Sequence, residues 1–127
     1  MRILLADDQP GVRFALARLL QRQPGLEPAS EAACAAECLA EARARPVDLV
    51  LLDWELPGAS AGLLDCLRKI RPGLSIIALS GRPEAGPDAL AAGADAFVSK
   101  GEPAEQLLAA IARLASKRGR MPEHDAG

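Results

Sequence analysis

The chain alternates short, almost wholly apolar segments with longer segments in which apolar residues recur every three or four positions. The apolar segments have the length of β-strands, and the periodic segments have the spacing of helices that bury one face. Strands are expected at residues 2–6, 26–30, 47–52, 74–79 and 96–99. Helices are expected at residues 10–23, 31–44, 60–70, 87–92 and 103–115. The pattern therefore predicts five strand–helix units.

Strands that alternate with helices form parallel sheets, because each helix returns the chain to the edge of the sheet where the previous strand began. The segment at residues 47–52 is apolar almost throughout, which is typical of a strand buried on both faces of such a sheet. Pro28 indicates that the second strand lies at an edge, because proline cannot donate to a ladder. The sequence thus predicts an α/β fold: a flavodoxin-like, doubly wound, five-stranded parallel sheet with strand order 2-1-3-4-5.

Polar residues end or directly follow four of these strands. Asp7 and Asp8 come after the first strand, Asp53 after the third, Ser80 after the fourth and Lys100 after the fifth. The carboxyl ends of parallel strands meet at one edge of the sheet, and ligands of open α/β sheets bind in the crevice there. The acids, the hydroxyl group and the ammonium group are therefore expected to share one crevice.

Three carboxylates in one crevice repel each other unless a cation joins them. A set of oxygen ligands favours Mg²⁺, which keeps several waters and pairs with phosphate oxygens. Such a site is suited to moving a phosphoryl group onto Asp53, because this chemistry depends mainly on positioning and on neutralising the transferring oxygens. Lys100, Ser80 and backbone N–H groups near Trp54 are expected to neutralise those oxygens. The only histidine is His124, in the last residues, so no proton-transfer residue is expected in the folded part.

Composition narrows the range of partners. Lys and Arg number 15 against 17 Asp and Glu, for a formal charge of −2, so nothing indicates affinity for nucleic acid or an anionic membrane. Three aromatic residues supply no stacking platform for single-stranded nucleic acid. The N-terminal residues lack the pattern of a signal peptide, so a cytoplasmic location is expected. Three cysteines without a secretion signal indicate free thiols rather than a disulfide framework.

At its strand ends the chain resembles the receiver domain of two-component response regulators. The resemblance covers residues 1 to about 116, and residues 117–127 are expected to form a flexible tail or the start of a linker. Its specificity comes from an ordered set of motifs with one motif at each of four strand ends. These motifs are Asp7-Asp8, Leu51-Leu52-Asp53 with Pro57-Gly58, Ala78-Leu79-Ser80-Gly81, and Phe97-Val98-Ser99-Lys100.

The resemblance implies a role for each residue of the crevice. It implies that Asp53 is the phosphoacceptor and that Lys100 pairs with the phosphoryl group. It further implies that Asp8 binds Mg²⁺ directly, that Asp7 acts mainly through a water, and that the backbone carbonyl of Glu55 is the other protein ligand. The phosphoryl donor would be a histidine kinase or a histidine phosphotransfer protein. The domain would catalyse its own aspartyl phosphorylation and dephosphorylation, without turning over a free substrate.

The resemblance also implies a switch. Ser80 would move toward the phosphoryl group and Phe97, the family's switch aromatic, would turn inward; a simple core aromatic is the alternative for Phe97. Phosphorylation would then change the face formed by the fourth helix, the fifth strand and the fifth helix. That face would serve an output partner or a linked output domain, and it is a candidate surface for a homodimer. The domain itself is expected to bind neither nucleic acid nor membrane.

Several positions depart from the family's usual residues. Ser80 stands where the family usually has threonine, which keeps the hydroxyl group. Gly101 replaces the proline that commonly follows the lysine, which puts the usual cis bond there in doubt. Glu55 and Arg82 occupy the positions that in the family tune how water reaches the phosphoryl group, and they can also pair across the mouth of the site. The proline-containing residues 83–87 predict a short or late-starting fourth helix.

Two other functions compete with the phosphorylated receiver. Gly101 and the unusual fourth helix leave room for a receiver-like binding module that recognises its partner without phosphorylation. Asp53, Ser80 and Lys100 also suggest a phosphatase of the haloacid dehalogenase type, although the order of the acids along the chain is reversed. The domain is either a stand-alone receiver or a receiver from a longer regulator, and its turns resemble those of receivers that precede DNA-binding domains.

Overall fold

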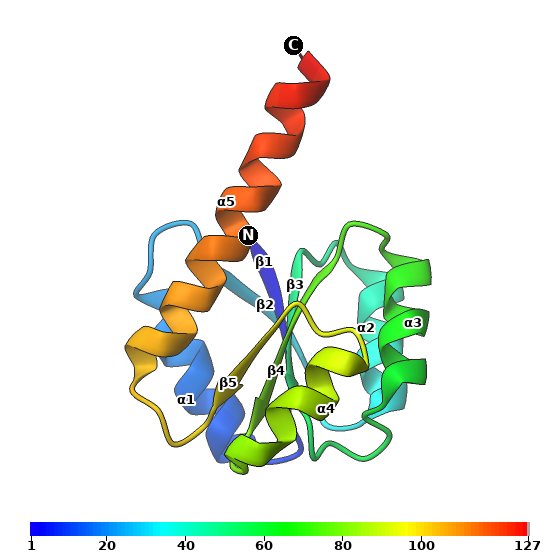
Figure 1. Cartoon of the computed structure of the whole chain (residues 1–127), viewed down its shortest axis with the longest axis vertical. Helices are drawn as coiled ribbons and strands as arrows, with labels where there is room; N and C mark the ends of the chain where they lie inside the picture. Colours follow the sequence, from blue (N-terminus) through cyan, green and yellow to red (C-terminus); the bar gives the residue numbers. More distant parts are fainter. Residues whose placement is uncertain (127) are drawn as a thin grey trace.

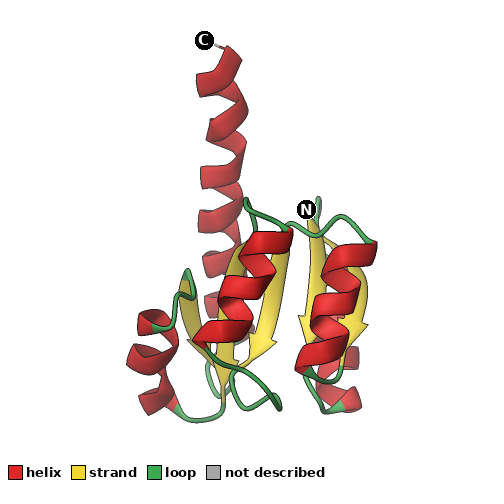
Figure 2. Ribbon diagram, turned by 90° about the vertical axis from the view of Figure 1, so that its right-hand side faces the viewer, coloured by secondary structure: helices red, strands yellow, loops and turns green. Residues whose placement is uncertain are grey.

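The computed structural model describes the backbone of residues 1–126 and the side chains of residues 1–118. Its five-stranded sheet has the order β2-β1-β3-β4-β5, and every neighbouring pair is parallel, as the sequence predicts. All strands accordingly point the same way in Figure 2. The strands are β1 (Arg2–Ala6), β2 (Glu27–Ala32), β3 (Leu49–Asp53), β4 (Ser75–Ser80) and β5 (Ala96–Ser99).

Helices cover both faces of the sheet. In Figure 1, α1 and α5 lie on one side, and α2, α3 and α4 lie on the other. A short 3-10 helix, η1, leads into α4. The bounds are α1 (Pro10–Gln21), α2 (Ala35–Ala44), α3 (Ala61–Ile70), η1 (Pro83–Ala85), α4 (Gly86–Ala91) and α5 (Ala104–Ala126).

Two separate hydrophobic clusters hold the helices to the sheet. Successive strand residues point to opposite faces, so Leu4 and Ile76 pack beneath α2, α3 and α4. Ile3 and Ile77 pack beneath α1 and α5, and all four side chains are completely buried. This arrangement explains why β1, β3 and β4 read as continuous apolar segments rather than as alternating ones. The sheet is therefore a rigid platform for the residues at its ends.

The edge strand β2 runs further than predicted. It continues to Ala32, because the ladder with β1 extends until the amide of Asp7 donates to the Ala32 carbonyl at 3.0 Å. The helix expected from residue 31 therefore begins only at Ala35. The Glu37 carboxylate accepts the amide of Ala33 at 2.7 Å and so helps to fix this helix start. The edge position that Pro28 indicates is confirmed.

The last two helices differ most in length. Helix α4 has six residues, close to the predicted range, and η1 precedes it. Helix α5 has 23 residues and reaches Ala126, whereas the sequence predicts that the helix ends near residue 115 and that a flexible tail or the start of a linker follows from residue 117. Contacts of Arg118 with Gly73 and Asp48 hold this part of the helix against the domain. The domain boundary at residue 116 stays a prediction, and the side chain of His124 lies outside those described.

Two further findings bear on the setting of the domain. Among the helices described, none combines the length and the apolar character that a membrane span requires. The three cysteines are free thiols, and Cys38 is completely buried. Burial, with a smaller contribution from the neighbouring Cys34, raises the pKa of Cys38 to about 12. This thiol is therefore a packing residue rather than a nucleophile.

Candidate functional site

The carboxyl ends of four strands meet at one edge of the sheet. Ala6 of β1 pairs with Leu52 of β3, so the next residues, Asp7 and Asp53, are neighbours across the ladder. On the other side of β3, the amide of Lys100 donates to the Ser80 carbonyl at 2.8 Å. The residues predicted to share one crevice do lie together, whereas their chemical roles stay predictions.

Three carboxylates form the centre of the site. Asp7, Asp8 and Asp53 each offer an oxygen, and the three oxygens lie within 4.8 Å of one another. Asp7 and Asp53 are only 2% and 3% exposed, while Asp8 is open to solvent. An all-oxygen set with two buried acids and one open side suits a hard cation such as Mg²⁺, which retains part of its water shell. The donor chemistry therefore fits the predicted ion.

A single lysine serves these acids. The Lys100 ammonium lies 2.8 Å from Oδ2 of Asp7 and 3.4 Å from Oδ1 of Asp53. Burial alone would lower the pKa of Lys100, but the hydrogen bond to Asp7 and the charges of both acids raise it overall. The ammonium is therefore charged at neutral pH. Three carboxylates therefore face one ammonium group, which leaves the crevice short of positive charge.

This imbalance shows at Asp53. Burial, and to a smaller extent the charge of Asp7, raises the pKa of Asp53 above its usual value. The Glu55 amide, which donates to Oδ1 of Asp53 at 3.0 Å, and the Lys100 ammonium oppose this effect without cancelling it. The ionised form of Asp53 is therefore disfavoured in the site as it stands, and added positive charge would stabilise it.

The hydroxyl group of Ser80 points to a glutamate. It lies 2.8 Å from both carboxylate oxygens of Glu55, and its oxygen accepts the Arg82 amide at 3.0 Å. The Arg82 guanidinium is 3.5 Å from Oε2 of Glu55, so the pairing of these two residues across the mouth of the site is present. Sequence reasoning missed the bond between Ser80 and Glu55.

The loop after β3 corrects one expectation and adds one contact. Of the backbone N–H groups near Trp54 that were expected to serve the transferring oxygens, the amide of Trp54 itself donates instead to the Leu79 carbonyl at 2.7 Å. It is occupied because the ladder between β3 and β4 continues one residue past the strand. The Trp54 indole donates to Oδ2 of Asp88 at 3.2 Å and so ties this loop to α4. No sequence signal pointed to this contact.

Comparison with known proteins agrees with this geometry. The family model of the response regulator receiver domain matches residues 3–112. The Fimbriae Z protein of Salmonella typhimurium is 31% identical over 117 residues, which are 90% of this chain and 56% of that protein. The chain belongs to the response regulator receiver family.

Two further matches are a transcriptional activator protein and the solved structure of a receiver domain protein. The transcriptional activator protein ExaE of Pseudomonas putida is 35% identical over 90% of this chain and 55% of its own length. A CheY-like receiver domain protein of Methanospirillum hungatei is 32% identical, with a TM-score of 0.78 over 94% of this chain and 97% of that chain. The receiver spans about half the length of the curated relatives it matches.

The aromatic side chain of Phe97 is closely packed. Phe97 of β5 is half-buried and lies against the core beneath α4. Gly86, the first residue of α4, faces its ring so closely that a Cβ at this position would lie 3.0 Å from Cδ2 of Phe97. A side chain at residue 86 would therefore force the ring to move. The packing suits either a core aromatic or a switch, and the role of Phe97 stays a prediction.

The loop after Lys100 completes the receiver site. The described residues contain no cis peptide bond, so the bond between Lys100 and Gly101 is trans. The amides of Lys100 and Glu102 nevertheless donate to the Ser80 and Ser99 carbonyls, at 2.8 and 3.1 Å. These bonds fix the loop without a proline.

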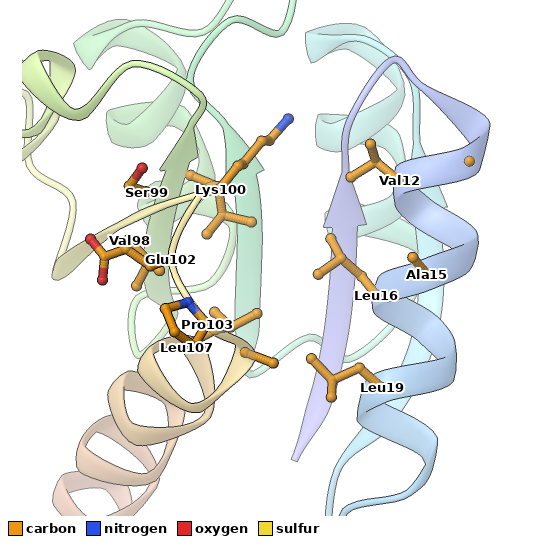
Figure 3. Close-up of a pocket in the computed structure, with 13 residues that line it drawn as sticks. Val12, Ala15, Leu16, Leu19, Val98, Ser99, Lys100, Glu102, Pro103 and Leu107 are labelled. Carbon is orange, nitrogen blue, oxygen red and sulfur yellow. The ribbon is translucent and has the colours of Figure 1, made fainter.

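An apolar groove borders the receiver site. It has a volume of about 520 Å³ and lies between α1 and the start of α5 (Figure 3). One wall is a row of α1 side chains, and the other comes from β5, the following loop and α5. Lys100 belongs to this second wall, so the groove adjoins the acidic crevice. Its labelled apolar residues are Val12, Ala15, Leu16, Leu19, Val98, Pro103 and Leu107.

Proposed function

We propose that this receiver takes a phosphoryl group onto Asp53 from a histidine kinase or a histidine phosphotransfer protein, in a Mg²⁺-dependent step. One observation carries the proposal: a buried carboxylate with a raised pKa lies among two further acids and one ammonium group. A structural acid would be paired, whereas this one is left short of positive charge. A reaction that brings a cation and a phosphoryl group into the crevice uses that shortage.

The contacts of Asp53 support different tasks for its two oxygens. Oδ1 accepts the Glu55 amide and lies 3.4 Å from the Lys100 ammonium. Oδ2 is therefore the oxygen that forms the new bond to phosphorus while the P–N bond of the donor's phosphohistidine breaks and the imidazole leaves. Lys100 exchanges its contact with Asp7 for one with a phosphoryl oxygen. Transfer then depends on position and charge, without a proton-transfer residue in the crevice.

The metal would be held by the acids that now repel each other. Asp8 and Asp53 would bind Mg²⁺ through carboxylate oxygens, the Glu55 backbone carbonyl would be a third ligand, and Asp7 would act mainly through a water. The bound ion supplies positive charge that neutralises these carboxylates and the transferring oxygens. The exposed position of Asp8 supports this proposal, because it leaves a solvent side for the ion's waters.

The groove of Figure 3 is the proposed docking site of the phosphoryl donor. Its apolar walls would bury a helix of the partner, and its contact with Lys100 would bring that helix beside Asp53. Ala15→Glu, at an exposed position of α1, should slow transfer from a purified phosphorylated phosphotransfer protein. Labelling by acetyl phosphate should stay unchanged, because that small donor needs no groove.

Output would follow from movement of Ser80 and Phe97, which would alter the face formed by α4, β5 and α5. The relative named as a transcriptional activator supports an output through gene control, by a linked DNA-binding domain or a separate partner. The same face is a proposed surface for a homodimer. A cytoplasmic site of action also belongs to this proposal.

The first experiment uses Trp54, the single tryptophan, which neighbours Asp53. Its fluorescence is followed while Mg²⁺ and then the phosphoryl mimic BeF₃⁻ are added to wild type and to Asp53→Ala. We expect a response to Mg²⁺ and a further, saturable response to BeF₃⁻ that is lost in the variant. A wild type that binds Mg²⁺ but not BeF₃⁻ would contradict the proposal and favour a phosphorylation-independent binding module.

A further inference from the structure

The hydroxyl group that is expected to move toward the phosphoryl group is already held elsewhere. We infer that Glu55 is a positioning residue for Ser80: its carboxylate holds the hydroxyl in the resting orientation and so opposes the response to phosphorylation. The inference rests on the proposed function. It goes beyond the family role of this position in admitting water, because it assigns the side chain a hold on the hydroxyl group itself.

The hydrogen bonds of Ser80 leave no proton for a new acceptor. A hydroxyl group has one proton, and this proton is shared between two carboxylate oxygens that each lie 2.8 Å away. The Ser80 oxygen also accepts the Arg82 amide at 3.0 Å. Because the side chain is completely buried, no water replaces these partners at low cost. Donation to a phosphoryl oxygen on Asp53 therefore requires that the bond to Glu55 break.

The bond that must break has a carboxylate as its acceptor. Hydrogen bonds to an ionised acceptor are about twice as strong as neutral ones. The Arg82 guanidinium, 3.5 Å from Oε2, steadies the carboxylate from the solvent side. The Arg82 and Glu55 side chains are 62% and 39% exposed, and an exposed pair of this kind contributes little by itself. The contact with buried Ser80 is therefore the one with consequence.

Charge repulsion between Glu55 and the phosphoryl group is the competing explanation, and the two make different predictions. If Glu55 holds the hydroxyl, the loss of the bond matters, and Glu55→Ala should have a larger effect than Glu55→Gln, which keeps a neutral acceptor. If Glu55 acts by repulsion alone, both variants remove the same charge and should have equal effects. Removing the Ser80 hydroxyl group distinguishes the two explanations a second time, because the hydrogen bond to Glu55 requires this group and charge repulsion does not.

The test measures the dissociation constant of BeF₃⁻ in saturating Mg²⁺, from the midpoint of the Trp54 fluorescence titration. We expect Glu55→Gln to bind BeF₃⁻ about threefold more tightly than wild type, and Glu55→Ala about tenfold. In a Ser80→Ala background the gain from Glu55→Ala should fall to about twofold or less. Ser80→Thr, which keeps the hydroxyl group, should restore the gain.

Equal gains in Glu55→Gln and Glu55→Ala that persist with Ser80→Ala would overturn the inference in favour of repulsion. Unchanged or weaker binding in both variants would overturn it as well. Failure of the proposed function would look different, because wild type itself would then bind no BeF₃⁻, or Asp53→Ala would bind it equally well.

Discussion

Aspartates lie at two edges of this sheet, the one where the strands begin and the one where they end. The two sets differ in their hydrogen bonds and ion pairs. At the edge where the strands begin, Asp48 precedes β3 and Asp95 precedes β5. Each accepts one backbone amide and one arginine: Arg2 and Arg118 for Asp48, and Ile76 and Arg68 for Asp95, with all four distances between 2.7 and 2.9 Å. Each of these acids is therefore paired with both a hydrogen-bond donor and a positive charge, and its role is structural.

At the edge where the strands end, three acids lie together, and two of them, Asp7 and Asp53, share the Lys100 ammonium. The residue type and its place beside a strand are the same as at the other edge, so neither indicates function. The difference lies in the supply of positive charge and hydrogen-bond donors. A strand-end aspartate is a reactive group when its neighbours leave it underpaired, and a structural group when they do not.

The largest expected effect is on phosphorylation. Asp53→Ala should abolish labelling by acetyl phosphate, because it removes the carboxylate that is proposed to accept the phosphoryl group. Asp48→Ala, the matched change at the opposite edge, should label at a rate within about twofold of wild type. Intact-mass measurement of the phosphorylated protein checks both. Equal loss of labelling in the two variants would mean that the edges are not functionally distinct.

The opposite edge should dominate stability. Asp95→Ala leaves the Ile76 amide without its acceptor and breaks the ion pair with Arg68, so the free energy of unfolding should fall by about 2 kcal/mol. Urea unfolding followed by circular dichroism measures this change. The folded variant should still accept a phosphoryl group from acetyl phosphate. A loss below about 0.5 kcal/mol would show that Asp95 is an ordinary surface acid.

Removing the charge at the reactive edge should have the reverse effect on stability. Asp53→Asn keeps an oxygen for the Glu55 amide and removes a buried charge that faces Asp7. Without Mg²⁺ the variant should gain about 1 kcal/mol, or roughly 3–6 °C in melting temperature. Saturating Mg²⁺ should stabilise wild type more than the variant and narrow the difference. Destabilisation of the variant in metal chelator would mean that Asp53 is well paired.

The smallest expected effect is a dependence on pH. Because the pKa of Asp53 is raised in the folded state, the folded protein binds more protons than the unfolded chain between pH 3.8 and that raised pKa. This contribution to stability is present at low pH and is lost as the pH rises through the window. The advantage of Asp53→Asn over wild type, measured by urea unfolding in chelator, should therefore shrink as the pH falls. If the difference in stability between the variant and wild type stays constant with pH, Asp53 is not the group that titrates in this window.

The fold and the meeting of the site residues could be predicted from the sequence because they depend on topology. Apolar strands that alternate with helices fix a parallel sheet, and a parallel sheet brings Asp7, Asp53, Ser80 and Lys100 to one edge. Pro28 placed the edge strand for an equally local reason, its missing N–H. No side-chain direction enters these inferences.

What could not be predicted depends on which donor reaches which acceptor. The Trp54 amide, one of the N–H groups near Trp54 that were expected to serve the phosphoryl oxygens, is occupied because the ladder extends past β3. The bonds from Ser80 to Glu55 and from Trp54 to Asp88 join residues 25 and 34 positions apart, and they require rotamers that no local pattern specifies. The extension of α5 was missed because its anchor, Arg118, contacts residues far along the chain.

Helix α5 connects the edge where the strands end with the edge where they begin. It begins just after Lys100, at the reactive edge, and its Arg118 is fastened to Asp48 at the structural edge. The span from Ala104 to Arg118 is about 21 Å of rigid helix at 1.5 Å per residue. Helix α5 is thus a rigid rod that packs along one face of the sheet. A displacement of the Lys100 loop therefore has a route to the far edge through α5, whose Leu107, Ile111 and Leu114 pack against the sheet.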